Sequence, residues 1–147
     1  LINRSRTKNR IMKKISESSI QQSCFLWLTN THGLKHNSPR LKMFSVPNEL
    51  AMMLGAILKS YRIPDSIVNK AVSQVLDKMK STGMTAGVSD SIVILPNKTL
   101  YVEFKTSTGI QSDKQKEFQQ IVTDLGHEYH VVRSLEQFKD IINENLR

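Results

Sequence analysis

The stretch 87–105, GVSDSIVILPNKTLYVEFK, decides the fold. It holds two β-type runs, 89–95 and 99–105, and the Pro96-Asn97 pair between them is typical of a turn. The two runs therefore predict a β-hairpin. Side chains alternate between the two faces of a strand, so Leu100, Val102 and Phe104 share one face, and Tyr101, Glu103 and Lys105 share the other.

Three charged residues stand at one end of this hairpin. Asp90 lies near the start of the first strand and Glu103 near the end of the second, so their carboxylates can meet across the pair, and Lys105 shares the face of Glu103. Two carboxylates beside one lysine suit the binding of Mg²⁺ at a phosphodiester. There the metal polarises the phosphate and lowers the pKa of a bound water. The plainer interpretation is a Glu103–Lys105 pair on a solvated sheet face, although acidic residues are depleted inside strands.

Helical periodicity is the main signal on the N-terminal side of the hairpin. A helix is predicted from an N-cap at Ser16 to the His32-Gly33 turn, and 33–48 is expected to be a loop because Pro39 and Pro47 interrupt it. Two further helices, at 50–61 and from 64 to about 80, together predict a helical insertion at 50–80.

The C-terminal part predicts a helix, a strand and a helix. The first helix opens at Ser112 and ends at Gly126, with an apolar stripe on one face, and the strand covers 129–132. The last helix starts at Ser134. We therefore expect an α/β fold, with a small mixed sheet flanked by helices. The residues of the apolar stripe are Phe118, Ile121, Val122 and Leu125.

Length and composition restrict the class of protein. A chain of 147 residues with 39% hydrophobic and 23% charged residues is expected to form one soluble domain, at 16–147. The single cysteine, Cys24, excludes an internal disulfide and favours a reducing intracellular compartment. The longest apolar stretch, 50–58, is too short to span a bilayer, so no membrane partner is expected.

The net charge of +8 is unevenly distributed. Residues 1–14 carry six basic and no acidic residues, 35–80 carry eight basic and three acidic, and 81–147 carry seven basic and nine acidic. This polarity is expected where a polyanion lies across one face, although solubility alone also accounts for positive charge.

The N-terminal segment 1–15 is interpreted as a basic tail. The chain opens with Leu1, and Met12 is followed by two lysines. Residues 1–11 can therefore be interpreted as preceding the native start. No apolar core follows the basic run, which argues against a signal peptide.

Several ordered motifs resemble a known family. Asp90 followed by Glu103-x-Lys105 on a hairpin resembles the PD-(D/E)xK nuclease motif, with Ser89 in place of its proline. More closely, residues 16–147 resemble the VRR-NUC family, the virus-type replication-repair nucleases, as a stand-alone phage-like member. This resemblance implies a restriction-endonuclease-like core. The matching motifs are Ser16-Glu17, Ile20-Gln21, Pro47-Asn48, Gly83-x-x-x-Gly87-x-x-Asp90, Glu103-Phe104-Lys105-Thr106, Gly109, Ser112-x-x-Gln115 and Gly126-x-x-Tyr129-x-Val131-Val132.

The resemblance also implies roles for single residues. Asp90 and Glu103 would coordinate Mg²⁺ or Mn²⁺ together with the backbone carbonyl of Phe104, and Lys105 would be the catalytic lysine. Glu17, on the first helix, would reach the metal directly or through water. Gln115 would contact the site or the nucleic acid backbone. Further contacts with nucleic acid are expected from Gln21, Asn48, Lys78, Lys80 and Ser112.

Plainer interpretations stay open for some of these residues. An acidic residue in a first helical turn, such as Glu17, is also favoured by the helix dipole. Ser112-x-x-Gln115 is also a capping box, in which the Gln115 side chain accepts from the Ser112 N–H. Lys78 and Lys80 can equally belong to a solvated helix face.

The function that the resemblance implies is metal-dependent hydrolysis of DNA phosphodiester bonds. A stand-alone member is expected to be a homodimer that cleaves branched DNA, such as four-way (Holliday) junctions, in DNA repair inside a bacterial or phage-infected cell. Flap cleavage is the alternative within the family, and a non-catalytic DNA-binding accessory protein is the alternative of a different class. Action on RNA or single strands has less support, since exposed stacking residues are not evident in a chain with 6% aromatic residues.

Overall fold

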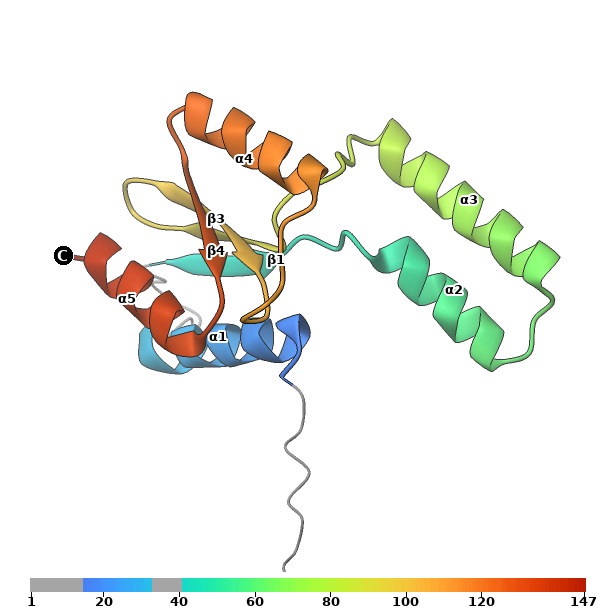
Figure 1. Cartoon of the computed structure of the whole chain (residues 1–147), viewed down its shortest axis with the longest axis horizontal. Coiled ribbons are helices and arrows are strands. Elements are labelled where there is room, and N and C mark those ends of the chain that lie inside the picture. Colours follow the sequence, from blue (N-terminus) through green and yellow to red (C-terminus); the bar gives the residue numbers. More distant parts are fainter. Residues whose placement is uncertain (1–14, 33–40) are drawn as a thin grey trace, which may run out of the picture.

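A mixed sheet forms the centre of the structure, a computed structural model that describes residues 15–32 and 41–147 (Figure 1). All but the last residue of the expected basic tail lies outside the described residues. The described elements follow in the order α1 Glu17–His32, β1 Lys42–Ser45, α2 Leu50–Ser60, α3 Asp65–Ser81, β2 Ser91–Ile94, β3 Thr99–Phe104, α4 Asp113–Asp124, β4 Glu128–Val132 and α5 Leu135–Asn145.

The four strands of this sheet lie in the order β1-β2-β3-β4. The expected hairpin is present, because β2 and β3 pair antiparallel with Ser91 opposite Val102. β1 pairs antiparallel with the other edge of β2, whereas β4 runs parallel to β3 after the crossover helix α4. The predicted α/β class, a small mixed sheet flanked by helices, is confirmed.

Helices cover both faces of the sheet (Figure 1). The hydrophobic core lies on the side of α1 and α5, where Leu28 and Phe138 pack with the predicted inward positions of β3, and Leu100, Val102 and Phe104 are all buried. α4 lies on the opposite face. Its Phe118 packs edge-on against Tyr101 and Tyr129 with ring centroids 5.8 and 6.3 Å away.

The strand β1 lies where the sequence pattern predicts a loop, and that prediction is wrong for this segment. Lys42 to Ser45 pair with the free edge of β2 over its whole length. Only Met43 of these four residues is buried. A strand of four residues with a single buried side chain is stabilised mainly by its pairing with β2. Its own sequence therefore gives little indication of a strand.

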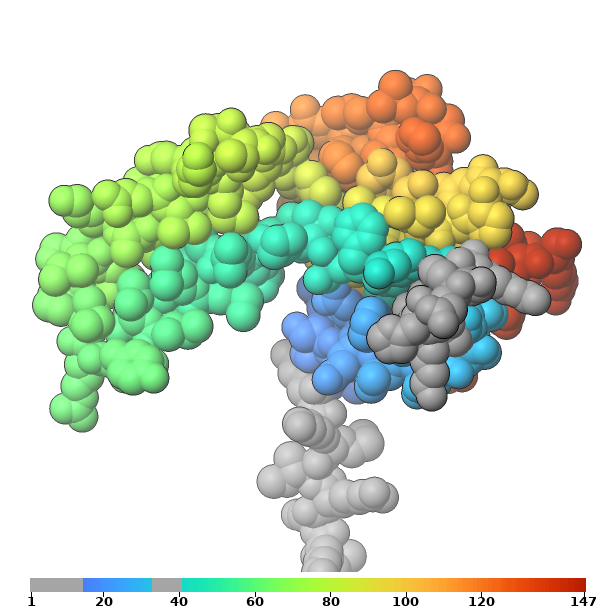
Figure 2. Space-filling model, turned by 180° about the vertical axis from the view of Figure 1, so that it is seen from behind, coloured from blue at the N-terminus to red at the C-terminus, as the bar shows by residue number. Residues whose placement is uncertain are grey.

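Helices α2 and α3 form an antiparallel hairpin that projects away from the sheet, here called the arm (residues 50–81; Figures 1 and 2). The two predicted helices are therefore present. Gly55 allows them to pack closely, because a Cβ at that position would lie 3.1 Å from Val72. The buried core contains no described residue of the arm, so the arm is stabilised by contact between its own two helices.

The helix α4 begins and ends as its sequence predicts. Ser112 Oγ accepts from the Gln115 N–H at 3.3 Å, Gln115 Oε1 accepts from the Ser112 N–H at 2.9 Å, and Gly126 follows with φ of 82°. Its expected apolar stripe is only half correct, because Val122 is buried and Phe118 partly buried whereas Ile121 and Leu125 are exposed. No helix among residues 15–32 and 41–147 is long and apolar enough to cross a bilayer.

Candidate active site

Asp90 and Glu103 lie one position beyond the last ladder pair of β2 and β3, Ser91 and Val102. The Phe104 N–H donates to Asp90 Oδ2 at 2.8 Å, which fixes the carboxylate against the end of β3. The N–H and C=O of a strand residue point to the same side of the strand, so the Phe104 carbonyl is directed to the side of Asp90. The structure therefore brings together the carboxylates that the hairpin register predicts.

Glu103 is completely buried, with 0% of its surface exposed. Lys105 Nζ donates to its Oε1 at 2.6 Å, and Gln115 Nε2 donates to the same oxygen. The Tyr129 hydroxyl donates to Oε2 at 3.4 Å. A buried carboxylate requires such partners, because an unpaired charge away from water is costly. The solvated Glu103–Lys105 pair is thus not the arrangement observed.

Glu17 approaches the same cluster from the first turn of α1, with its Oε2 3.9 Å from Lys105 Nζ. A Cβ at Gly109 would lie 3.1 Å from Glu17 Oε1, so the loop after β3 passes close beside this carboxylate. The Arg133 guanidinium holds that loop by donating to the carbonyls of Thr106 and Gly109.

Two of the residues predicted to contact nucleic acid hold the protein backbone near Asp90, and a third caps a helix. Gln21 Nε2 donates to the Asp90 carbonyl at 3.3 Å and to Ser91 Oγ at 2.9 Å. Asn48 Nδ2 donates to the Val88 carbonyl at 2.8 Å. Ser112 caps α4, as described above.

Gln115 combines the two interpretations that the sequence leaves open. Its Oε1 completes the capping box and its Nε2 donates to Glu103. By contrast, Lys78 and Lys80 lie exposed on the last turn of α3, and neither pairs with a carboxylate of the cluster.

Burial and neighbouring charge shift the pKa values of the cluster. Desolvation raises the pKa of Asp90 despite the Phe104 N–H and Lys105, which lower it. Desolvation also raises the pKa of Glu103 against the opposing bond from Lys105. Burial lowers the pKa of Lys105, but the bond to Glu103 and the charges of Glu103, Glu17 and Asp90 outweigh burial, so its pKa lies above the ordinary value. Lys105 is therefore a cation at neutral pH.

The donor set fits Mg²⁺ or Mn²⁺. No group of three or more His, Cys, Asp or Glu side chains is poised around one metal position in the part of the chain that the structure describes. Mg²⁺ does not require one, because it commonly binds through one or two carboxylates and keeps several waters. Asp90, Glu103 and the Phe104 carbonyl supply hard oxygen atoms. The charge of Asp90 raises the pKa of Glu103, and the charges of Glu17 and Glu49 raise that of Asp90, so a divalent cation would offset repulsion among these carboxylates.

Comparison with known proteins supports the fold. No family model matches the sequence, and no curated protein matches it. Among solved structures, a chain described as a VRR_NUC domain protein is similar to this one, with a TM-score of 0.56 and 15% identity over 90% of this chain and 89% of that chain. The chain therefore has a VRR-NUC-type fold, as the sequence resemblance predicts.

Sequence reasoning assigned no role to Tyr129 or Arg133, and it interpreted Gly87 only as a turn glycine that lets the backbone approach the site. Tyr129 contacts Glu103, Arg133 holds the loop after β3, and Gly87 touches the backbone at the start of α4. Tyr129 and Gly87 belong to the motifs that resemble the VRR-NUC family, and this resemblance was the signal that could have pointed to their roles. Exposed aromatic residues are also present, since Phe25 is 43% exposed. The structure therefore presents an exposed aromatic ring that the low aromatic content did not indicate.

Proposed function

We propose that this protein is a metal-dependent DNA nuclease. The observation that carries the proposal is the cluster of Asp90, Glu103 and Lys105 at the end of the β2–β3 hairpin, within a VRR-NUC-type fold. Paired carboxylates and a buried lysine are the groups expected for hydrolysis of a phosphodiester. Fold alone does not define an activity, so the proposal depends on this geometry.

The residues of the cluster have distinct proposed roles. Asp90, Glu103 and the Phe104 carbonyl would hold Mg²⁺ or Mn²⁺, which when bound polarises the phosphate and lowers the pKa of a water. Lys105, a cation beside Glu103 and Glu17, would place its N–H donors against the phosphate or the attacking water. Gln115 would hold Glu103 in its orientation. Glu17 would act from α1, through water.

Branched DNA is the proposed substrate, with four-way junctions ahead of flaps. A homodimer would present two sites related by a two-fold axis, which matches the symmetry of a four-way junction. An apolar stripe supports a homodimer through the arm, because four residues at helical spacing, three in α2 and one just after it, are exposed. They are Leu50, Met53, Ile57 and Tyr61.

Sedimentation velocity tests the homodimer. Ile57→Lys introduces a charge on the exposed stripe of α2 and is expected to convert the dimer to a monomer. Leu26→Lys places the same charge on α1, at a residue of similar exposure, 51% against 52%, and is expected to leave the dimer intact. A monomeric wild type, or equal effects of both variants, would exclude the arm as the dimer interface.

Cleavage assays test the nuclease itself. Labelled four-way junction, flap and linear duplex DNA are incubated with the protein and with Asp90→Ala, in Mg²⁺, Mn²⁺ and EDTA. The wild type is expected to cut branched DNA in either metal, and both Asp90→Ala and EDTA are expected to abolish cutting. Metal-independent binding without any cleavage would instead identify a non-catalytic DNA-binding protein.

A further inference from the structure

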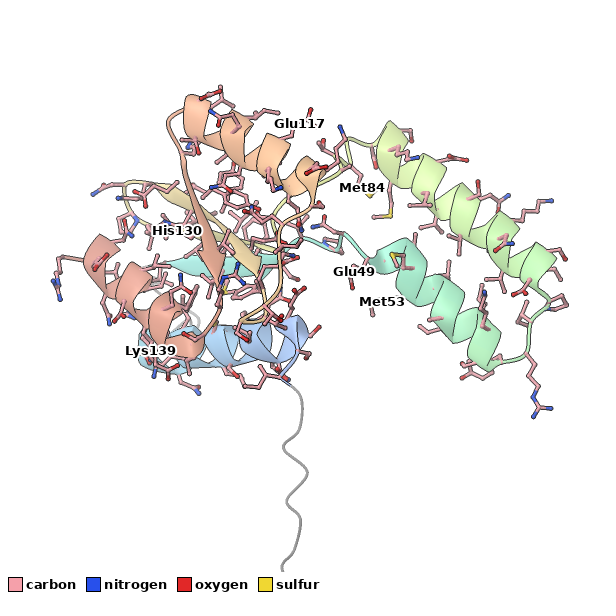
Figure 3. All side chains as sticks on the ribbon, in the orientation of Figure 1. Glu49, Met53, Met84, Glu117, His130 and Lys139 are labelled. Atoms are coloured by element: carbon pink, nitrogen blue, oxygen red, sulfur yellow. The ribbon has the colours of Figure 1, made fainter. Side chains whose placement is uncertain are left out.

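A second hollow adjoins the candidate active site on the α1 side of the sheet. This α1–β1 hollow has a volume of about 420 Å³ and lies between α1 and the edge strand β1. Ser18, Gln21 and Ser45 also line the smaller hollow that contains Asp90, so the two hollows are adjacent. Figure 3 labels Glu49 and Met53 at the base of the arm, where both line the smaller hollow.

Gln21 forms the wall between the two hollows. Its Nε2 donates to the Asp90 carbonyl and to Ser91 Oγ, and Ser91 lines the α1–β1 hollow. The α1–β1 hollow therefore begins one residue away from a carboxylate of the acidic cluster. A nucleotide whose phosphate lay at Asp90 would have its neighbouring base within reach of this space.

The lining of the α1–β1 hollow suits a base and does not suit a phosphate. No charged side chain lines it among the described residues, so a phosphate would find no cation there. Phe25 presents an exposed ring, and Met43 adds buried apolar surface from β1. Gln22 and Ser45 are exposed and uncharged, and they offer both donors and acceptors to the edge of a base.

Building on the proposed nuclease function, we propose that the α1–β1 hollow binds an unpaired nucleobase adjacent to the scissile phosphate, with Phe25 stacked against its face. A base within a duplex is stacked between its neighbours and cannot enter such a hollow without leaving the helix. Phe25 is then a specificity-determining residue. It selects DNA in which the nucleotide at the cleavage position is unpaired, as in a flap, or is more easily unpaired than within a continuous duplex, as at the exchange point of a four-way junction.

Binding measurements with a single missing base test this inference. Fluorescence anisotropy is measured in Ca²⁺, without cleavage, on branched DNA in which one abasic nucleotide is moved through each position on either side of the branch. One position is expected to weaken binding by the wild type about tenfold, the effect of losing one stacked base. Phe25→Ala is expected to weaken binding of intact DNA equally and to bind that abasic DNA no worse than the wild type does.

Two further variants make the result specific. Phe44→Ala removes a ring of similar exposure, 41%, that points to the opposite face of β1 from Met43, and it is expected to have no effect. Phe25→Trp keeps an aromatic face and is expected to restore binding of intact DNA, which a folding defect at this position would not allow.

Three outcomes would overturn the inference. One is an equal loss on intact and abasic DNA with Phe25→Ala, another is an equal loss with Phe44→Ala, and the third is tolerance of an abasic nucleotide at every position. If the wild type still cleaves branched DNA in Mg²⁺, any of these outcomes contradicts only the proposal that the α1–β1 hollow binds a base. If the wild type neither binds nor cleaves DNA, the proposed nuclease function falls together with it.

Discussion

Glu103 is a fully buried carboxylate, and its need for partners explains the arrangement of single residues around it. Lys105 supplies the opposite charge, whereas Gln115 and Tyr129 supply neutral donors from α4 and β4. Gln115 uses its other end to cap α4, so one side chain connects the start of a helix to the acidic cluster. Stability and chemistry are therefore linked at this residue, and they can be separated by comparison with Ser112.

Substitution of Gln115 by alanine is expected to lower the cleavage rate in Mg²⁺ roughly 10- to 100-fold, because Glu103 loses the partner that orients it. Ser112→Ala removes the other half of the capping box and leaves the Glu103 contact in place. It is expected to cost about 1 kcal/mol in the free energy of unfolding, with a rate close to that of the wild type. Urea unfolding and single-turnover cleavage measure both quantities. Equal loss of rate in the two variants would mean that Gln115 acts only as a cap.

Asp90 predicts a pH dependence of stability in the absence of metal. Burial raises its pKa above 3.8, so the folded state binds this proton more tightly than the unfolded state does. The stability contribution of Asp90 therefore falls as pH rises through the raised pKa, and it stays low at pH 7. Asp90→Asn keeps an acceptor for the Phe104 N–H and removes the charge. At pH 7 in EDTA, Asn is expected to raise the Tm by roughly 2–5 °C, with the gain shrinking at acid pH.

Mg²⁺ should reverse the order of these two proteins. A cation that binds the folded state stabilises it by mass action, so Mg²⁺ is expected to raise the Tm of the wild type and not that of Asp90→Asn. Thermal unfolding followed by circular dichroism at pH 7 and at acid pH, with and without Mg²⁺, measures four Tm values for each protein. A lower Tm for Asp90→Asn in EDTA at pH 7 would show that the buried charge is not unfavourable.

At the scale of elements, the position of α4 is set by backbone contact with Gly87, in the segment between α3 and β2. Gly87 has φ of 81°, and a Cβ there would overlap the Lys114 carbonyl and lie 2.8 Å from the Gln115 nitrogen. Only glycine allows both this conformation and this approach. The contact places the first turn of α4 where Gln115 can reach Glu103.

Gly87→Ala is therefore expected to cost roughly 2–4 kcal/mol in the free energy of unfolding and to reduce cleavage as strongly as Gln115→Ala does. Gly83 offers the matched control, because it also has positive φ, 99°, while nothing lies within 4 Å of its Cβ position. Gly83→Ala is expected to cost only about 1–2 kcal/mol, the conformational penalty, and to cleave normally. If both variants lost the same stability and the same activity, the contact with α4 would be unimportant.

At the scale of the whole molecule, the arm and the sheet differ in how they are stabilised and in their charge. The arm packs on itself, and its lysines and arginine stay exposed, with Lys59 paired to Asp65 at 3.3 Å. The acidic cluster lies at the sheet, where a bound cation would be needed before DNA approached. This separation is consistent with phosphate contacts at the arm and chemistry at the sheet.

The double variant Lys78→Ala/Lys80→Ala tests that separation. Two lost phosphate contacts are expected to reduce the slope of log affinity against log salt by about two, with little change in the preferred DNA structure. Lys98→Ala is the control, because its ammonium pairs with Glu128 at 2.7 Å at the opposite end of the β2–β3 hairpin. Titrations in Ca²⁺ at several salt concentrations provide the slopes. An unchanged slope in the double variant would place both lysines on a solvated face.

The sequence by itself determined the features that depend on neighbours along the chain. The helices, their caps at Ser16 and Ser112 and the β2–β3 hairpin all follow from local pattern and turn chemistry. Asp90 and Glu103 could be paired in advance because the register of a hairpin is set by its own turn. Gln115 could be named, although its two roles could not be separated.

Only the tertiary structure decided the features that depend on distant segments. β1 forms because β2 offers a free edge, Tyr129 reaches Glu103 because β4 lies beside β3, and Glu17 meets Lys105 because α1 packs on the same sheet end. The hollow beside Phe25 exists because α1 and β1, which are separate in the chain, lie next to each other. Such contacts join residues far apart in the chain, and no local periodicity records which surface a distant element covers or leaves open.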